Sequence, residues 1–191
     1  SAKFSADSGR SSTDFVTNIA AQTIQGELLD NVMAGWEVKV SVDNGAHWST
    51  ASTSVGSNTW SLAGQTLIGN NILQVKVHDN VSGTDGLVFY KYYSFDTTVS
   101  APGLALAADT GVSNLDSITN NGTVNVTGLE GPASCQYRVD GGAWVDAVGP
   151  SFTLSSGTHT YSVRQTDLAG NTSSASAAVT YTFDSVAPTL V

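Results

Sequence analysis

The sequence is poor in cysteine and in positive charge, with one cysteine and seven basic residues among 191. A single cysteine excludes an intrachain disulfide. Because no histidine or other base lies near Cys135 in the sequence, we expect a small, partly buried strand residue rather than a reactive thiol. Sixteen acidic residues bring the net charge to −9, which argues against the basic patch that a nucleic acid or an anionic membrane surface requires. No apolar run approaches the roughly 18 residues of a membrane span, so we expect no membrane insertion.

Strong helix formers are also scarce. Charged residues make up only 12% of the chain, about half of the usual share, and Ser, Thr, Gly, Asn and Val dominate instead. This composition is typical of an all-β protein. Forty per cent of the residues are hydrophobic, which is enough for a packed core.

What the sequence does contain is an internal repeat. The stretch "ADSGRSSTDFVTN", which begins at Ala6, aligns without a gap with "ADTGVSNLDSITN", which begins at Ala108. Three later pairs also match: "VSVDNGAHW" with "YRVDGGAW", "LQVKVHD" with "YSVRQTD", and "YYSFDTTVSAP" with "TYTFDSVAP". Self-similarity at this spacing predicts two copies of one module of roughly 90 to 100 residues, the size of an immunoglobulin-like sandwich. We place the domains at residues 1–98 and 99–191.

Period-two alternation between turn residues predicts short strands in both copies. In the second copy the strands are expected at 103–107, 123–128, 135–139, 143–144, 151–155, 158–165 and 175–183. In the first copy they are expected at 22–28, 36–42, 58–62, 72–77 and 87–95. Asp43 and Asp140 lie in Asp-Asn-Gly and Asp-Gly-Gly stretches, which favour hairpin turns. The predicted fold is two tandem immunoglobulin-like β-sandwiches of about seven strands each, without helices.

The repeated acids are expected to meet between the two sandwiches. Loops of a sandwich fall at two poles, which places Asp7, Asp14 and Asp96 at one pole of the first copy. Asp167 and Asn171 belong to the pole of the second copy that the linker enters. Three carboxylates, an amide oxygen and local carbonyls approach the 6 to 8 oxygens that Ca²⁺ prefers. Without a cation, carboxylates held about 4 Å apart would repel one another by roughly 1 to 4 kcal/mol per pair. The alternative is that each acid only forms a turn.

The same reasoning predicts half of a calcium site at each free end of the pair. Asp109, Asp116 and Asp184 would form one half-site, and Asp79 and Asp85 the other. Transition metals are not expected, because the histidines are scattered along the sequence and the one thiol stands alone. The three histidines are His47, His78 and His159. Ca²⁺ is therefore the only cofactor that the sequence predicts.

Four stretches of the second copy, "DTGVSNLDSITNNGTVNVTGLE", "QYRVDGGAW", "SVRQTDLAGNTS" and "FDSVAP", resemble a known family. They are similar to the bacterial Ig-like tandem repeats of giant adhesins exported by type I secretion, which act in biofilms or bind host cells. The resemblance runs from about Leu104 to Pro188. It implies an Ig-like fold, linker Ca²⁺ and an extracellular, rod-like stalk on the bacterial cell surface. By motif, the family's linker acids match Asp7, Asp14, Asp96 and Asp167. The first copy departs from the motif, with "HDNVSGTDG" in place of "TDxAGN".

Three classes of function remain open at this point. The first is a stalk spacer, a monomer whose partners are neighbouring repeats of the same chain, with a host or bacterial surface bound by another region. The second is a module that binds a carbohydrate or a surface, for which the candidate residues are Trp48, Trp60, Tyr90, Tyr92 and Tyr93. The third is an accessory domain of a secreted enzyme. Catalysis by this chain is not expected, because no nucleophile–base set, metal triad or phosphate loop is present.

Overall fold

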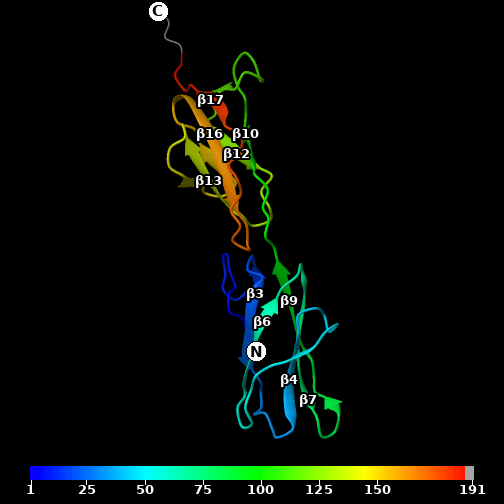
Figure 1. Ribbon diagram of the computed structural model, residues 1–191. Helices are drawn as coiled ribbons and strands as arrows, with labels where there is room; N and C mark the ends of the chain where they lie inside the picture. The colour runs from blue at the N-terminus through cyan, green and yellow to red at the C-terminus, as the bar shows by residue number, and fades with distance from the viewer. Residues whose placement is uncertain (188–191) are drawn as a thin grey trace, which may run out of the picture. The chain divides into compact units, whose positions relative to one another are not determined.

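A computed structural model describes residues 1–187 (Figure 1). Pro188, at which the family resemblance ends, lies outside the described residues. The chain divides into two compact units. Unit 1 consists of Ser1–Thr97 together with Leu168–Asn171, and unit 2 consists of Thr98–Asp167 and the residues from Thr172 onward. Every regular element in the described part is a β-strand, which confirms the all-β prediction.

Unit 1 is a sandwich of two sheets. One sheet contains β1 (Ala2–Phe4), β3 (Ala21–Glu27) and β6 (Thr59–Thr66), in that order. The other has the order β2 (Val16–Thr17), β9 (Phe89–Phe95), β7 (Asn71–Asp79), β4 (Trp36–Ser41) and β5 (Ser49–Thr50), and β8 (Thr84–Asp85) also pairs with β7. All pairs are antiparallel except β2 with β9, which is parallel.

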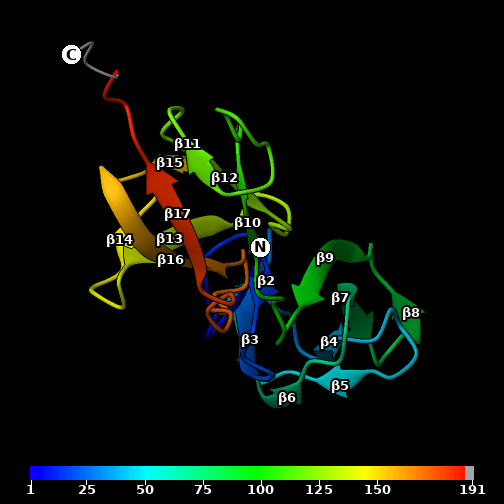
Figure 2. The same ribbon diagram turned by 90° about the horizontal axis from the view of Figure 1, so that it is seen from above.

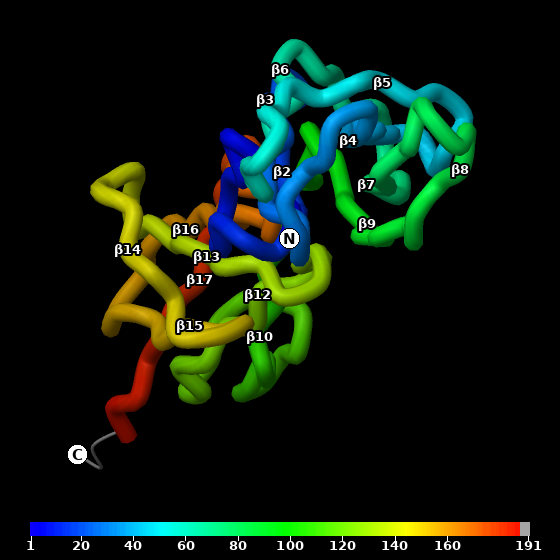
Figure 3. Tube along the Cα trace, turned by 90° about the horizontal axis from the view of Figure 1, so that it is seen from below, coloured from blue at the N-terminus to red at the C-terminus, as the bar shows by residue number. Residues whose placement is uncertain are grey.

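Unit 2 repeats this plan. Its smaller sheet contains β10 (Gly103–Leu106), β12 (Thr123–Thr127) and β15 (Ser151–Thr153), which lie side by side in Figure 3. Its larger sheet has the order β11 (Ile118–Thr119), β17 (Val179–Phe183), β16 (Gly157–Thr166), β13 (Ser134–Val139) and β14 (Val145–Asp146) (Figure 2). Among the described residues of unit 2, the one parallel pair joins the two-residue strand β11 to the last strand, β17.

Alternate residues of the strands form the two cores, as the period-two pattern predicts. In β12, for example, Val124 and Val126 are buried while their neighbours are exposed. Unit 1 buries Ile24, Val38, Val40, Trp60, Leu67 and Leu73 with an aromatic cluster of Phe4, Phe15 and Tyr93. Unit 2 buries Val124, Val163 and Cys135 with an aromatic group of Phe152, Tyr161 and Tyr181. The structure buries Cys135 in strand β13, as the sequence predicts, and burial raises the pKa of its thiol.

Several strands differ from the prediction. The last strand of unit 2 begins at Val179 rather than at residue 175, because the preceding segment runs beside β16 as irregular backbone. There, Ser173 and Ser176 donate their N–H groups to the carbonyls of Gln165 and Val163. The hairpin strand expected at Ala143–Trp144 lies instead at Val145–Asp146. The two-residue strands β2, β5, β8 and β11 were not predicted, because two residues are too few to show a period.

Two of the aromatic residues suggested as ligand-binding belong to the core. Trp60 is 3% exposed and Tyr93 is 4% exposed, so both side chains are almost entirely removed from solvent. Tyr90 and Tyr92 are 59% and 76% exposed, because these alternate positions of β9 point away from the core. Trp48 is half-buried beneath the ammonium group of Lys76.

Candidate metal-binding and ligand-binding sites

The repeated acidic segment folds into the same loop in both units. In each, it connects the first strand of the smaller sheet to the short parallel strand of the larger sheet. Asp7 Oδ2 accepts the N–H of Phe15 at 3.0 Å, and its counterpart Asp109 Oδ2 accepts the N–H of Ser117 at 3.1 Å. Both donors lie in the left-handed region, at φ 67° for Phe15 and 63° for Ser117. Because side chains disfavour this region, the carboxylates hold a loop that would otherwise relax.

The second aspartate of each loop has a local role. Asp14 Oδ1 accepts the N–H of Val16 at 3.0 Å, and Asp116 Oδ1 accepts the N–H of Ile118 at 3.1 Å. These are turn-type hydrogen bonds across two residues. Each uses one carboxylate oxygen and leaves the other oxygen available.

The first aspartate of each loop has an oxygen that the protein does not satisfy. Asp7 Oδ1 and Asp109 Oδ1 are buried and accept no hydrogen bond from the described residues. Burial raises the pKa of Asp7; the N–H of Phe15 lowers it, and the neighbouring charge of Asp14 raises it again. A buried acceptor without a donor costs free energy, so a cation at this oxygen would be stabilising.

The end of strand β9 lies beside this loop in unit 1. The N–H of Asp96 donates to the carbonyl of Thr17 at 3.0 Å, directly after the β2–β9 pairing. In unit 2, the N–H of Asp184 donates to the carbonyl of Thr119, also at 3.0 Å. Each unit therefore brings its final aspartate to the pole where its acidic loop lies.

The segment Leu168–Asn171, which follows strand β16 in the sequence, belongs to unit 1. The N–H of Arg10 donates to the carbonyl of Leu168 at 3.2 Å. Asn171 Nδ2 donates to the carbonyl of Asp96 at 2.8 Å, and Asn171 Oδ1 accepts from Asn18 Nδ2 at 3.1 Å. Asn171 was predicted to be a metal ligand, and here its amide oxygen accepts a hydrogen bond from another side chain of unit 1.

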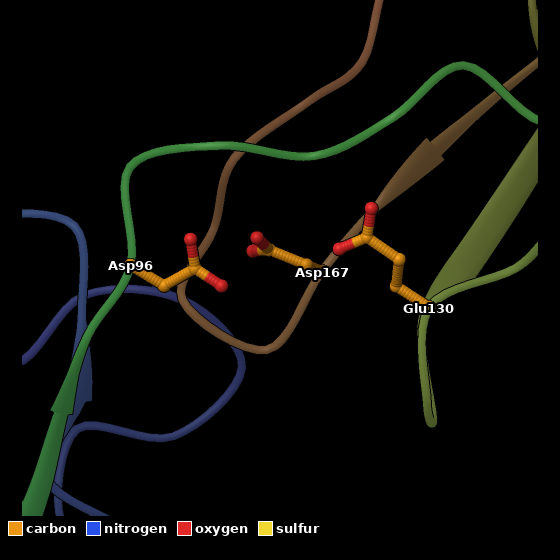
Figure 4. Close-up of side chains that lie close together, drawn as sticks. All are labelled: Asp96, Glu130 and Asp167. Atoms are coloured by element: carbon orange, nitrogen blue, oxygen red, sulfur yellow. The ribbon is translucent and has the colours of Figure 1, made fainter. Parts of the chain in front are cut away.

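Unit 2 contributes a close pair of carboxylates, Glu130 and Asp167. One oxygen of each lies within 4.8 Å of the other (Figure 4). Asp167 is only 9% exposed. Glu130 is fixed in place, because its Oε1 accepts the N–H of Ser100 at 2.7 Å and its own N–H donates to the buried amide of Gln165 at 2.8 Å.

Glu130 was not among the predicted ligands. It lies in a loop three residues beyond β12, far from Asp167 in the sequence. The one available signal was that Glu130 is the only glutamate of the second repeat, in a chain that otherwise uses aspartate in its loops.

The two acids predicted as a half-site in "HDNVSGTDG" are engaged by donors of unit 1. Asp79 accepts the N–H of Val81 at 2.8 Å and the hydroxyl of Ser82 at 2.7 Å. Asp85 accepts Lys76 Nζ at 2.6 Å and His78 Nδ1 at 2.8 Å. The hydrogen bond from Ser82 lowers the pKa of Asp79, and the one from Lys76 lowers that of Asp85.

Each of the three histidines is paired with an aspartate. His47 lies 2.6 Å from Asp43, His78 lies 2.8 Å from Asp85, and His159 lies 2.7 Å from Asp140. These pairs belong to separate turns and strands. The histidines therefore have structural partners within the chain.

Unit 1 also has an apolar cavity that opens to solvent. It has a volume of about 510 Å³ and is lined mainly by Trp36, Trp60, Leu29, Leu87 and Phe89. Leu29 and Leu87 stand fully exposed at its rim. Apolar cavities of this size are typical of small-molecule sites, so this cavity is a candidate ligand site of unit 1.

Comparison with known proteins agrees with the fold. Residues 96–185 match the family model described as bacterial Ig-like domain, so the chain contains an Ig-like repeat domain. A search of curated protein sequences gives no match. Within residues 1–187, no helix is long and apolar enough to span a membrane.

Two solved structures are similar to this chain. The fibronectin(III)-like modules of Clostridium thermocellum CbhA are 17% identical, with 96% of this chain and 94% of that chain covered and a TM-score of 0.39. A cytokine receptor complex is 14% identical, with 86% of this chain and 92% of that chain covered and a TM-score of 0.35.

Proposed function

We propose that this chain is a pair of stalk repeats from a large secreted bacterial adhesin, and that Ca²⁺ bound where one repeat leads into the next stiffens the stalk. Bacterial Ig-like domains are typically extracellular or surface-exposed, which agrees with this role. The observation that carries the proposal is the acidic loop, which folds alike in both units and leaves a buried carboxylate oxygen without a donor in each.

The ligands of the proposed site are the acids at the point where the chain passes between units. Glu130 and Asp167 form the carboxylate pair of unit 2. Asp96 precedes Ser100 by four residues, and the N–H of Ser100 is bound to Glu130. An extended chain covers at most about 3.6 Å per residue, so the backbone alone keeps Asp96 within about 14 Å of Ser100.

Ca²⁺ fits these donors better than a transition metal does. The available atoms are carboxylate and carbonyl oxygens, which hard cations prefer, whereas the imidazoles and the thiol are engaged or buried elsewhere. When bound, the ion would neutralise carboxylates that otherwise repel one another. The residues with the strongest claim are Asp96, Glu130 and Asp167, and the orphan oxygens of Asp7 and Asp109 offer further positions.

The test is the thermal stability of the whole chain with and without Ca²⁺. A ligand that binds only the folded state stabilises by RT ln(1 + [L]/Kd), about 2.7 kcal/mol at a hundredfold excess over Kd. We expect millimolar Ca²⁺ to raise the unfolding temperature, and the double substitution Glu130→Gln and Asp167→Asn to abolish the increase. Asp30→Asn, at an exposed loop acid, is the matched control and should keep the increase.

The stalk role is tested separately by small-angle scattering. Millimolar Ca²⁺ should give a longer and stiffer particle than chelator does. An unchanged scattering profile, with normal Ca²⁺ binding by calorimetry, would contradict the stiffening role. Absence of any Ca²⁺ binding would overturn the proposal altogether.

A second candidate function is a ligand-binding role for unit 1. The exposed Tyr90 and Tyr92 of β9 favour it, because the second repeat has Ala178 and Thr180 at these positions and the fold therefore does not require tyrosine there. The core residue Tyr93, by contrast, is also a tyrosine in the second repeat, Tyr181. The cavity beneath Leu29 and Leu87 is the other feature that favours it. Saturable binding to a glycan array that is lost in Tyr90→Ala with Tyr92→Ala would support this role over a pure spacer.

A further inference from the structure

Unit 2 concentrates its positive charge at one place. Arg138 and Arg164 are the only lysine or arginine residues after Thr98 in the sequence. They lie on neighbouring strands, since β13 pairs with β16 so that Arg138 faces Ser162 and Gln136 faces Arg164. Residues alternate between faces, and Cys135 of β13 packs in the core, so both arginines lie on the outer face of the larger sheet.

Both guanidinium groups contact the same indole ring. The Cζ atom of Arg138 is 4.7 Å from the ring centroid of Trp144, and that of Arg164 is 4.4 Å from it. Trp144 follows the Asp140–Gly142 turn and is half-buried. Contact with the face of an indole attracts a cation, which helps to hold two like charges near one another.

No carboxylate neutralises these two charges. Among residues 1–187, neither arginine forms an ion pair. Arg164 Nε donates to Gln136 Oε1 at 2.8 Å, and Gln136 Nε2 donates in turn to Asp146 Oδ1 at 2.8 Å. A neutral amide thus occupies the position between Arg164 and the carboxylate. Arg138 Nε is buried without an acceptor, although a guanidinium carries five N–H donors.

The corresponding cation of unit 1 is neutralised. Lys76 occupies the position of Arg164 and lies 4.2 Å from the ring centroid of Trp48, but it also forms an ion pair with Asp85 at 2.6 Å. Ser41 occupies the position of Arg138. The free pair of guanidinium groups is therefore specific to unit 2 and is not required by the fold.

We propose that the outer face of unit 2, at the cluster of Arg138, Trp144 and Arg164, binds a carboxylate-bearing polysaccharide, a uronate. The planar fork of a guanidinium matches the two oxygens of a carboxylate. The half-exposed indole beside it offers an apolar surface for the sugar ring. The net charge of −9 disfavours binding of a long nucleic acid. This activity is additional to the spacer role and does not depend on the calcium site.

The decisive variant is Gln136→Glu. It keeps the size of the side chain, loses the exposed hydrogen bond to Asp146 and places a carboxylate against Arg164, so it should neutralise the site without changing the fold. The probe is a six-residue oligogalacturonate in low-salt buffer free of divalent cations, and binding is followed by the indole N–H signals in nuclear magnetic resonance. We expect saturable shifts of the Trp144 signal, and affinity at least tenfold weaker in Gln136→Glu and in Arg138→Ala.

Three controls decide the outcome. Lys76→Ala in unit 1 should leave the affinity unchanged, and Arg138→Lys should retain part of it. Maltohexaose, which is neutral, should not bind; equal binding of the two sugars would overturn the proposal. Unchanged affinity in Gln136→Glu would also overturn it, as would binding of inorganic sulfate or of a heparin hexasaccharide in the absence of oligogalacturonate binding.

Discussion

The two units have the same acidic loop but differently composed hydrophobic cores. In unit 1, Phe15 of the acidic loop packs against Phe4, which also contacts Tyr93, and most of the remaining core is aliphatic. Unit 2 stacks Tyr137 on Phe152 at 4.1 Å and continues to Tyr161 and Tyr181. A sandwich accepts such exchanges when total volume is kept. The acidic loop, by contrast, recurs with its hydrogen bonds intact, which indicates that it is kept for a reason other than packing.

A glycine shared by both loops shows the largest difference between the units. Gly9 has φ +88°, and a Cβ there would lie 2.0 Å from the carbonyl oxygen of Leu168. Its counterpart Gly111 has φ +104° and open space around it. Gly9→Ala should therefore cost about 1 to 2 kcal/mol of backbone strain plus about 1 to 3 kcal/mol of steric conflict, whereas Gly111→Ala should cost the strain alone.

Hydrogen exchange of the two variants distinguishes these costs. In Gly9→Ala, the amide of Arg10 should lose protection, because its acceptor is the carbonyl of Leu168. Gly111→Ala should leave that amide protected. Equal loss of stability in the two variants, with the Arg10 amide unchanged, would show that Leu168–Asn171 does not pack against the loop of unit 1 in solution.

The sequence was sufficient to predict the sandwich but not all of the candidate sites. Alternation in a strand such as β12 is visible from the residues alone, and so is the recurrence of Asp7 as Asp109. Glu130 was missed because its approach to Asp167 depends on the buried amide of Gln165, which joins segments distant in sequence. The pairing of Arg138 with Arg164 was missed for a similar reason, since it depends on the register between β13 and β16.

A conserved core tyrosine gives an intermediate difference. Tyr93 donates its hydroxyl to the carbonyl of Val42 at 2.6 Å, whereas the hydroxyl of Tyr181 makes no hydrogen bond with the described residues, although both side chains are buried. Tyr93→Phe should lower the free energy of unfolding of unit 1 by about 0.5 to 1.5 kcal/mol. Tyr181→Phe should change the free energy of unfolding of unit 2 by less than Tyr93→Phe changes that of unit 1. Urea denaturation of each variant measures the two values, and a larger loss from Tyr181→Phe would contradict the assignment.

The smallest expected difference between the units is in how the stability of their hairpins, at Asp43 in unit 1 and Asp140 in unit 2, depends on pH. In unit 1, burial works against ionisation of Asp43, but hydrogen bonds from the His47 N–H and from Ser41 prevail and lower its pKa to about 2. Asp43 therefore contributes stability that is present above its unfolded pKa of 3.8 and is lost as the pH falls through about 2. The contribution of Asp43 should therefore not change with pH near neutrality.

In unit 2, His159 stabilises the equivalent hairpin by pairing with Asp140. The hydrogen bond to Asp140 raises the pKa of His159, and the carbonyl of Ser156 at the other ring nitrogen raises it further. Since both partners are acceptors, the doubly protonated ring satisfies both and the neutral ring only one. The stabilisation is complete below the unfolded pKa of 6.5 and is lost as the pH rises through the higher folded value. Unit 2 should therefore be slightly less stable at pH 8 than at pH 6, and His159→Gln should remove that difference. His47→Gln in unit 1 is the matched control; if it removed the difference instead, the hairpin of unit 2 would not be its source.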